Sequence, residues 1–122
     1  MTYDEAILRA DLTRPNELEP ELKIGWLCAL DGVLRREVLL PCEGEVPPAQ
    51  EPPDLDPGKA QLLVSFPDDE LYVFYLVMRI DLENGELERY NNDALLYRQA
   101  LQAWAAAWRR SHRPRGVDSL RF

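Results

Sequence analysis

Apolar residues recur along most of this chain at intervals of three and four positions, the spacing that places them on one face of a helix. The pattern predicts four helices, near residues 2–13, 17–40, 67–84 and 86–112. Residues 61–66 could add a short strand. The fold class that follows is all-α, a four-helix bundle-like domain.

Capping residues and prolines set the ends of the first two predicted helices. Thr2 can cap the first helix, with Glu5 at the capping-box spacing. This helix stops before Arg14-Pro15, because a residue that precedes proline disfavours the helical conformation. Asn16 is a suitable cap for the second helix, and Pro20 fits in its first turn.

Two glycines, Gly25 and Gly32, lie within the second predicted helix. Each costs about 1 kcal/mol relative to alanine in a helix interior. Such a cost is tolerated where another backbone approaches closely, so we expect a close contact there. Asp31, beside Gly32, is either a surface residue or a buried carboxylate bonded to polar residues of the fourth helix or to an arginine.

The third predicted helix begins at residues 67–70, a proline followed by three acidic residues, which is a favourable first turn. Residues 71–78 are apolar on nearly every side. They predict a central helix covered by its neighbours, or a helix with one face in a subunit contact. A buried strand is the competing interpretation. Arg79 with Glu83 four residues later favours a helix, which Asn84-Gly85 ends.

The fourth predicted helix has an apolar seam at the spacing used for packing helix against helix. Its members are Leu87, Tyr90, Ala94, Tyr97, Leu101, Trp104 and Trp108. Asn91 and Asn92 are unfavourable inside a helix, because their side chains compete for backbone hydrogen bonds. They are either exposed and tolerated, or bonded to another helix or a neighbouring subunit. Trp26 and Trp104 are expected in the core, and Trp108 in the core or an interface.

Two segments depart from the helical pattern. Residues 41–66 form a long acidic loop, with six prolines between positions 41 and 57. Proline at this density removes backbone donors and forbids a helix, so we expect an extended, polyproline-like loop. Residues 113–122 are expected to form an extended basic tail after the helical domain of residues 1–112.

Charge separates the body of the chain from its tail. The net charge is −8; residues 1–108 hold nine Lys/Arg and twenty-one Asp/Glu, whereas residues 109–122 hold five Arg and one Asp. An acidic body is poorly suited to coating nucleic acid, which requires a broad basic face. The tail is either solvated, or it docks on an acidic partner with Phe122 as an apolar anchor.

The sequence contains no catalytic motif of the common kinds: no glycine-rich phosphate loop, no His-Glu-x-x-His and no Gly-x-Ser-x-Gly. His112, the only histidine, is better explained as a helix cap than as a general base. Cys28 and Cys42 are expected to be unpaired thiols, with a disulfide between them as the alternative. We therefore expect no enzyme, no cofactor, no metal ion and no membrane span.

Two stretches resemble a widespread family of phage and prophage proteins. One is Lys23–Gly32 with Arg36-Glu37-Val38. The other runs from Asp69-Glu70-Leu71-Tyr72 to His112–Gly116, and its specific part is Asn84-Gly85-Glu86 followed by Tyr90-Asn91-Asn92. The family is that of the head–tail connector, or adaptor, proteins, which are small helical proteins of the phage neck.

The resemblance implies a structural virion protein, assembled in the host cytoplasm, that forms a dodecameric ring below the portal protein. Such a ring extends the DNA channel, lets DNA pass without specific binding, and joins another neck or tail protein. Residues expected to bind the portal or another partner are Trp108, Arg109, Arg110, Arg113, Arg115, Arg121 and Phe122. Residues expected between subunits are Asp31, Tyr72, Tyr75, Tyr90, Asn91 and Asn92.

Two other functions fit the same sequence. The chain could be a different neck or tail-completion protein. It could also be a non-enzymatic module that binds a host protein, with the acidic loop mimicking nucleic acid.

Overall fold

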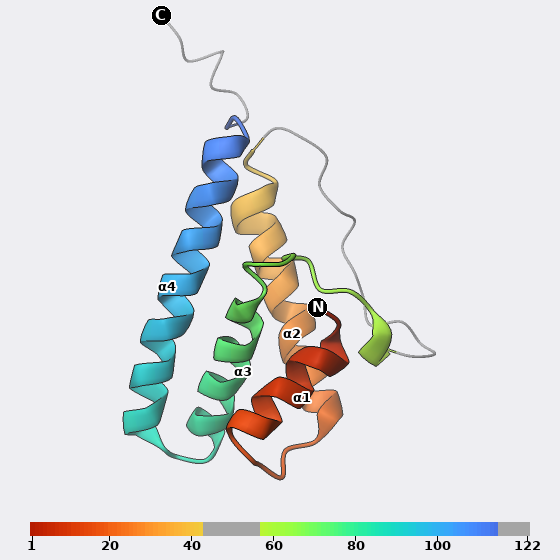
Figure 1. Cartoon of the computed structure of the whole chain (residues 1–122), viewed down its shortest axis with the longest axis vertical. Coiled ribbons are helices and arrows are strands. Elements are labelled where there is room, and N and C mark those ends of the chain that lie inside the picture. The colour runs from red at the N-terminus through yellow and green to blue at the C-terminus, as the bar shows by residue number, and fades with distance from the viewer. Residues whose placement is uncertain (43–56, 115–122) are drawn as a thin grey trace, which may run out of the picture.

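The structure, a computed structural model, describes residues 1–42 and 57–114. Four α-helices follow one another along this part of the chain (Figure 1): α1 (Tyr3–Thr13), α2 (Pro20–Leu34), α3 (Glu70–Glu83) and α4 (Leu87–Ser111). A π-helical turn, η1 (Arg35–Leu39), prolongs α2, and a short 3-10 turn, η2 (Pro57–Lys59), lies before α3. The prediction of an all-α, four-helix domain is confirmed.

The predicted strand at residues 61–66 is wrong. Within the described residues, Gln61 forms only a single antiparallel bridge with Thr2. Beside it, the amide of Leu62 donates to the carbonyl of Met1 at 3.0 Å. The chain from residue 60 to residue 66 is therefore an irregular segment that is attached to the start of α1. Most of the proline-rich loop, residues 43–56, lies outside the described residues.

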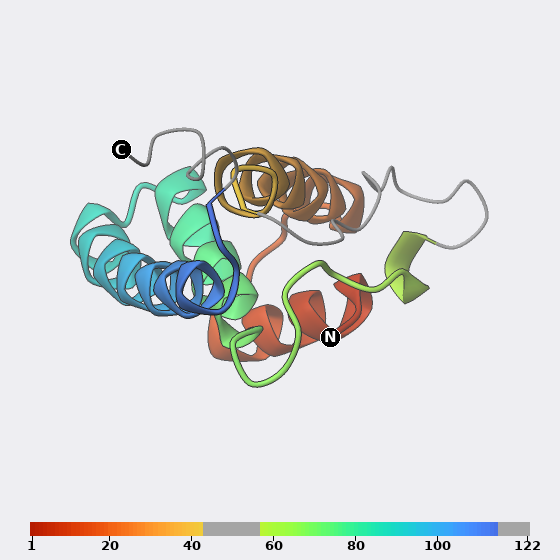
Figure 2. The same ribbon diagram turned by 90° about the horizontal axis from the view of Figure 1, so that it is seen from above.

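The central helix of the bundle is α3. Seen from above, α1 and α2 lie on opposite sides of the pair formed by α3 and α4 (Figure 2). Leu71, Tyr72, Leu76 and Ile80 of α3 are fully buried. The prediction of a helix covered by its neighbours is confirmed, and the buried-strand interpretation of the same residues is wrong.

Local hydrogen bonds close the helix ends where the sequence indicated them. Thr2 Oγ1 accepts from the Glu5 amide at 3.2 Å, which caps α1 as predicted. Gly85 has a φ of +73°, a conformation that suits glycine, and follows the end of α3. The amide of Glu86 then donates to the carbonyl of Asp81 at 2.9 Å. This bond belongs to a Schellman motif, which lets α4 fold back along α3.

The turn between α1 and α2 is organised differently from the prediction. The residue before α2 is Glu19, and its side chain makes no capping bond. Asn16 lies too far from the helix to cap it. It accepts from the Leu18 amide at 3.1 Å and donates to Asp11 Oδ1 at 2.9 Å. The same Asp11 oxygen lies 2.8 Å from Nζ of the buried Lys23, so the turn is held by a polar network between the two helices.

A second buried network joins α2, α3 and the irregular segment. Asp31 Oδ1 accepts from the Tyr72 hydroxyl at 2.6 Å, and Asp31 Oδ2 accepts from the Leu63 amide at 3.0 Å. The Tyr72 hydroxyl in turn accepts from the Val64 amide at 2.8 Å. Burial raises the pKa of the Asp31 carboxyl, and the bonds from Tyr72 and Leu63 oppose that rise.

Asp31 and Tyr72 are therefore core residues of the subunit. They are 7% and 0% exposed, so their expected place between subunits is wrong. Of the alternatives for Asp31, the buried carboxylate is correct. Its partners are the Tyr72 hydroxyl and the Leu63 amide, and not polar residues of the fourth helix or an arginine.

The two glycines of α2 do not mark a close backbone contact. Gly25 and Gly32 are both exposed, and a methyl group at either position would meet no atom within 4 Å. The expectation of a close contact is wrong, because both residues lie on the outer side of α2.

Tyr72→Phe is expected to destabilise the protein by about 1–3 kcal/mol, because it leaves Asp31 Oδ1 and the Val64 amide without the Tyr72 hydroxyl as a partner. Urea unfolding measures the change in the free energy of unfolding. The matched control is Tyr75→Phe at a half-buried tyrosine of the same helix, where a change within about 0.5 kcal/mol is expected. Equal losses in the two variants would contradict the role of the Tyr72 hydroxyl.

Gly25→Ala is expected to stabilise the protein by about 0.5–1 kcal/mol, since alanine is the better helix former and the site is open. Thermal unfolding followed by circular dichroism measures the effect. A loss of stability would show that Gly25 has a contact that the exposed face of α2 does not reveal.

Candidate functional site

The surfaces beside α4 are the most distinctive features of the described part. This helix packs along α3 and meets the chain that follows α2 at η1. α1 and α2 lie on opposite sides of the α3–α4 pair (Figure 2). One hollow of the surface is lined by α1, α3 and α4, and another by α2, η1 and α4. These two hollows are called the α1–α4 groove and the α2–α4 groove.

The α1–α4 groove has an apolar floor and one polar end. Its volume is about 580 Å³. Val73, Phe74 and Val77 of α3 line it, with Leu12 of α1 and Leu96 of α4. Leu12 and Leu96 are exposed. An open apolar surface of this kind is typical of a binding surface.

Two aspartates and one arginine form the polar end of the α1–α4 groove. Arg14 Nε lies 3.1 Å from Asp81 Oδ2, and Arg14 Nη2 lies 3.7 Å from Asp93 Oδ1. Asp81 is 1% exposed and Asp93 is 9% exposed. One guanidinium thus faces two buried carboxyl groups, and it connects α1 to α3 and α4.

Asp93 lies close enough to Asp81 for a proton on Asp93 to be shared between the two carboxyl groups. Asp81 Oδ1 and Asp93 Oδ2 are buried, and neither makes a hydrogen bond within residues 1–42 and 57–114, although Asp81 Oδ1 lies 3.0 Å from Arg14 Nε in an ion pair. Burial, together with the neighbouring Asp81, raises the pKa of Asp93 to about 7, against the opposing effect of Arg14 and Arg89. Protonated Asp93 can then donate to Asp81, which satisfies both groups.

The α2–α4 groove, on the other side of α4, has a volume of about 520 Å³. Its apolar lining comes from α2 and α4, and includes Leu30, Val33, Leu34, Tyr97, Leu101 and Ala105. Val33 remains 42% exposed. Glu37 and Arg109 lie at its edges. This groove therefore presents apolar side chains between α2 and α4, which have little direct contact with each other.

Tyr75, Tyr90 and Asn91, which were expected between subunits, lie near one face of the α3–α4 pair. Tyr90 and Asn91 line a further hollow that also contains Tyr97. The ring of Tyr97 packs against Tyr75, with centroids 5.2 Å apart, and burial raises the pKa of Tyr97 to about 12. Asn91 and Asn92 are exposed, so a role between subunits stays a prediction for them. Sequence reasoning placed Tyr97 only in the packing seam, although it lies seven residues after Tyr90.

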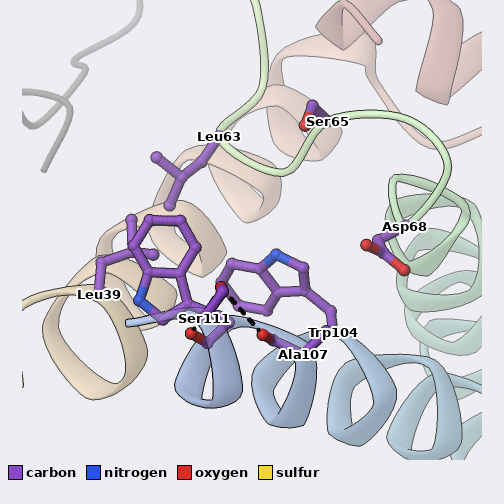
Figure 3. Close-up of a pocket in the computed structure, with 8 residues that line it drawn as sticks. Leu39, Leu63, Ser65, Asp68, Trp104, Ala107 and Ser111 are labelled. Carbon is purple, nitrogen blue, oxygen red and sulfur yellow. Dashed lines mark hydrogen bonds between the residues drawn. The ribbon is translucent and has the colours of Figure 1, made fainter. Parts of the chain in front are cut away.

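A smaller pocket of about 250 Å³ lies near the end of α4 (Figure 3). Trp104 and Trp108 line it, with Asp68 and Ser65 from the segment before α3. Trp104 is buried, as predicted, whereas Trp108 is half-buried and stacks on His112 with ring centroids 3.6 Å apart. The pocket thus lies where the helical body meets the tail.

Other sequence predictions have mixed outcomes. Trp26 is only half-buried, and the Arg79 guanidinium lies over its ring at 4.6 Å. His112 Nδ1 lies 3.0 Å from the Trp108 carbonyl, in agreement with a helix cap. Arg109, Arg110 and Arg113 are exposed at the end of the described chain. The remaining predicted tail residues, Arg115, Arg121 and Phe122, lie outside the described residues.

The described residues contain no group of three or more His, Cys, Asp or Glu that could hold a metal ion. Cys28 and Cys42 are not joined by a disulfide, so both are thiols as expected. No helix in residues 1–42 and 57–114 is long and apolar enough to cross a membrane.

Asp93→Asn is expected to make stability less dependent on pH. Since the pKa of Asp93 rises from 3.8 to about 7, the folded protein gains stability from the bound proton at low pH and loses it as the pH rises through 7. Asparagine keeps a donor towards Asp81 without the charge. A tenfold change in proton affinity corresponds to about 1.4 kcal/mol, and solvent at the groove reduces the full effect. We expect the variant and the wild type to be equally stable at low pH, and the variant to be about 2 kcal/mol more stable at mildly alkaline pH.

Urea unfolding at both pH values measures this difference, with the exposed Glu88→Gln as the matched control. A gain of the same size at both pH values would contradict proton sharing between Asp81 and Asp93.

Comparison with known proteins was made at three levels. The chain matches no protein-family model, no curated protein and no solved structure.

Proposed function

We propose that this protein is a head–tail connector subunit of a tailed bacteriophage, a structural and non-enzymatic component of the virion assembled in the host cytoplasm. It forms a ring, a dodecamer by the resemblance, below the portal protein. The ring extends the DNA channel and joins the head to another neck or tail protein. The proposal rests on the resemblance described above, and the surfaces of the helical domain support it.

The observation that carries the proposal is the presence of unlike apolar surfaces on different sides of the domain: the side of α1 and the α1–α4 groove, which share the exposed Leu12, and the α2–α4 groove. A ring is built from heterologous contacts, in which one surface of a subunit meets a different surface of the next. A small domain with two unlike apolar surfaces, facing in different directions, meets this requirement. The described residues leave both grooves uncovered, and a domain that acts alone would gain nothing from this.

The most specific part of the resemblance has a defined place in the fold. Asn84-Gly85-Glu86 forms the turn that reverses the chain between α3 and α4. Tyr90 and Asn91 follow in the first turns of α4 and line the hollow beside Tyr97. The motif therefore combines Gly85, whose conformation the turn requires, with Tyr90 and Asn91, which lie on an accessible surface.

Charge supports the proposed positions of the body and the tail. The acidic body suits the wall of a channel, because like charge keeps DNA from adhering as it passes. Arg109, Arg110 and Arg113 are exposed at the opposite end of α4 from the α3–α4 turn. In the proposal, the basic tail that starts there binds an acidic surface of the portal.

Removal of residues 113–122, which follow α4, is expected to weaken binding to purified portal rings at least tenfold. Affinity is measured by surface-immobilised portal with the connector in solution. The matched control replaces Arg113, Arg115 and Arg121 by lysine, keeps the charge and should retain most of the binding. Unchanged binding after truncation would contradict a docking tail, and no binding by the full chain to its cognate portal would contradict the proposed function.

A further inference from the structure

The outer face of α1 carries two apolar side chains that residues 1–42 and 57–114 do not cover. Leu8 and Leu12 are 61% and 75% exposed, one helical turn apart. Asp4 and Glu5 lie on the same face of α1 and are also exposed. Asp4, Glu5, Leu8 and Leu12 together are called the leucine ridge.

The leucine ridge has the form of a helix that binds in a groove. Helices that dock in this way present apolar anchors at positions i and i+4, as Leu8 and Leu12 do. The core-facing side of α1 is already complete, because Tyr3, Ala6 and Ala10 are buried against the rest of the domain. The ridge is therefore available for a contact outside the subunit.

The α2–α4 groove is an apolar surface suited to receive such a helix. It offers Leu30, Val33 and Leu101 along two helices, and it remains open. Within one subunit the ridge cannot reach it, since α1 and this groove lie on opposite sides of the α3–α4 pair (Figure 2). Contact between the two surfaces thus requires a second copy of the chain.

Charge favours the same pairing. Arg109 lines the α2–α4 groove, and Arg98 follows Tyr97 of its lining; both arginines are exposed. Glu37, the one acidic residue of the lining, is already paired with Arg36. The ridge carries the Glu5 carboxylate next to its leucines, and the Asp4 carboxylate at its N-terminal end, against Gly58 of η2. Opposite charges around two apolar surfaces align them and disfavour other partners.

The α1–α4 groove is a poorer acceptor for the ridge of another copy. Leu12 is itself part of its wall, so a helix in this groove would compete with the ridge. Arg9, at the same groove, is already paired with Glu70.

We infer that neighbouring copies join by inserting the leucine ridge of one subunit into the α2–α4 groove of the next. This inference rests on the proposed function and names the two surfaces that build the ring. Each copy uses its ridge on one side and its groove on the other, so the contact repeats from copy to copy until the ring closes.

Two defective variants that complement each other test the inference. The ridge variant carries Leu8→Asp and Leu12→Asp, and the groove variant carries Val33→Asp. All three positions are exposed, and circular dichroism and thermal unfolding confirm that each variant is folded. The matched control is Leu95→Asp, at an exposed leucine of α4 that lines neither groove.

Sedimentation velocity, up to millimolar protein, is expected to show concentration-dependent assembly of the wild-type chain and of the control. Each defective variant alone should self-associate at least tenfold more weakly. An equimolar mixture should form a dimer and nothing larger, because only the intact ridge of the groove variant and the intact groove of the ridge variant remain. Native mass spectrometry should show one copy of each variant in that dimer.

Three results would overturn the inference: a wild-type chain that stays monomeric, defective variants that assemble like the wild type, or a mixture that forms no mixed dimer. Binding to the portal separates this failure from that of the proposed function. If the tail still binds the portal while no mixed dimer forms, the ridge and groove are wrong and the connector proposal stands. If the mixed dimer forms and the full chain does not bind the portal, the contact between ridge and groove stands and the connector proposal is wrong.

Discussion

The buried carboxylate of Asp31 is the interaction on which the arrangement of this domain depends. An irregular segment inside a small protein brings backbone amides that must find partners. Asp31 and the Tyr72 hydroxyl supply them for Leu63 and Val64, and they bond to each other as well. One charged group therefore sets the positions of α2, α3 and the segment between them. Its removal would leave several buried polar groups without partners, and an apolar replacement could not hold the segment.

This way of holding α2 explains why the bundle remains open. The helix is anchored through polar bonds to α3 and to the segment before it, and packing against α4 is needed only at η1. On the other side, Arg14 attaches α1 to Asp81 and Asp93. Both attachments bypass the apolar surface of α4. The helices are thus held together while the apolar surfaces beside α4 stay accessible in the described part of the chain.

Features that depend on a few neighbouring residues were predictable from the sequence. The cap at Thr2, the stop at Gly85 and the central place of α3 each follow from local chemistry or from helical periodicity. Features that depend on contacts between residues far apart in the sequence were not predictable. The sequence left Asp31 open between a surface residue and a buried carboxylate, and it did not single out Asp93. Only the fold brings Tyr72 to one and Asp81 to the other. Asn16 had the right chemistry for a cap, but the helix begins too late for it to reach. The grooves arise from the angles between helices, which a pattern of apolar positions does not specify.

The tight turn at Gly85 also bears on the order in which the chain folds. The two helices that it joins are adjacent in sequence and share the most extensive packing of the domain. Contacts between neighbours along the chain form with little loss of chain entropy, whereas Arg14 must find Asp81 across 67 positions. We therefore expect the α3–α4 hairpin to form early and to serve as the template on which the N-terminal helices dock. A newly synthesised chain would then expose its α4 surfaces to other chains before α1 and α2 have docked.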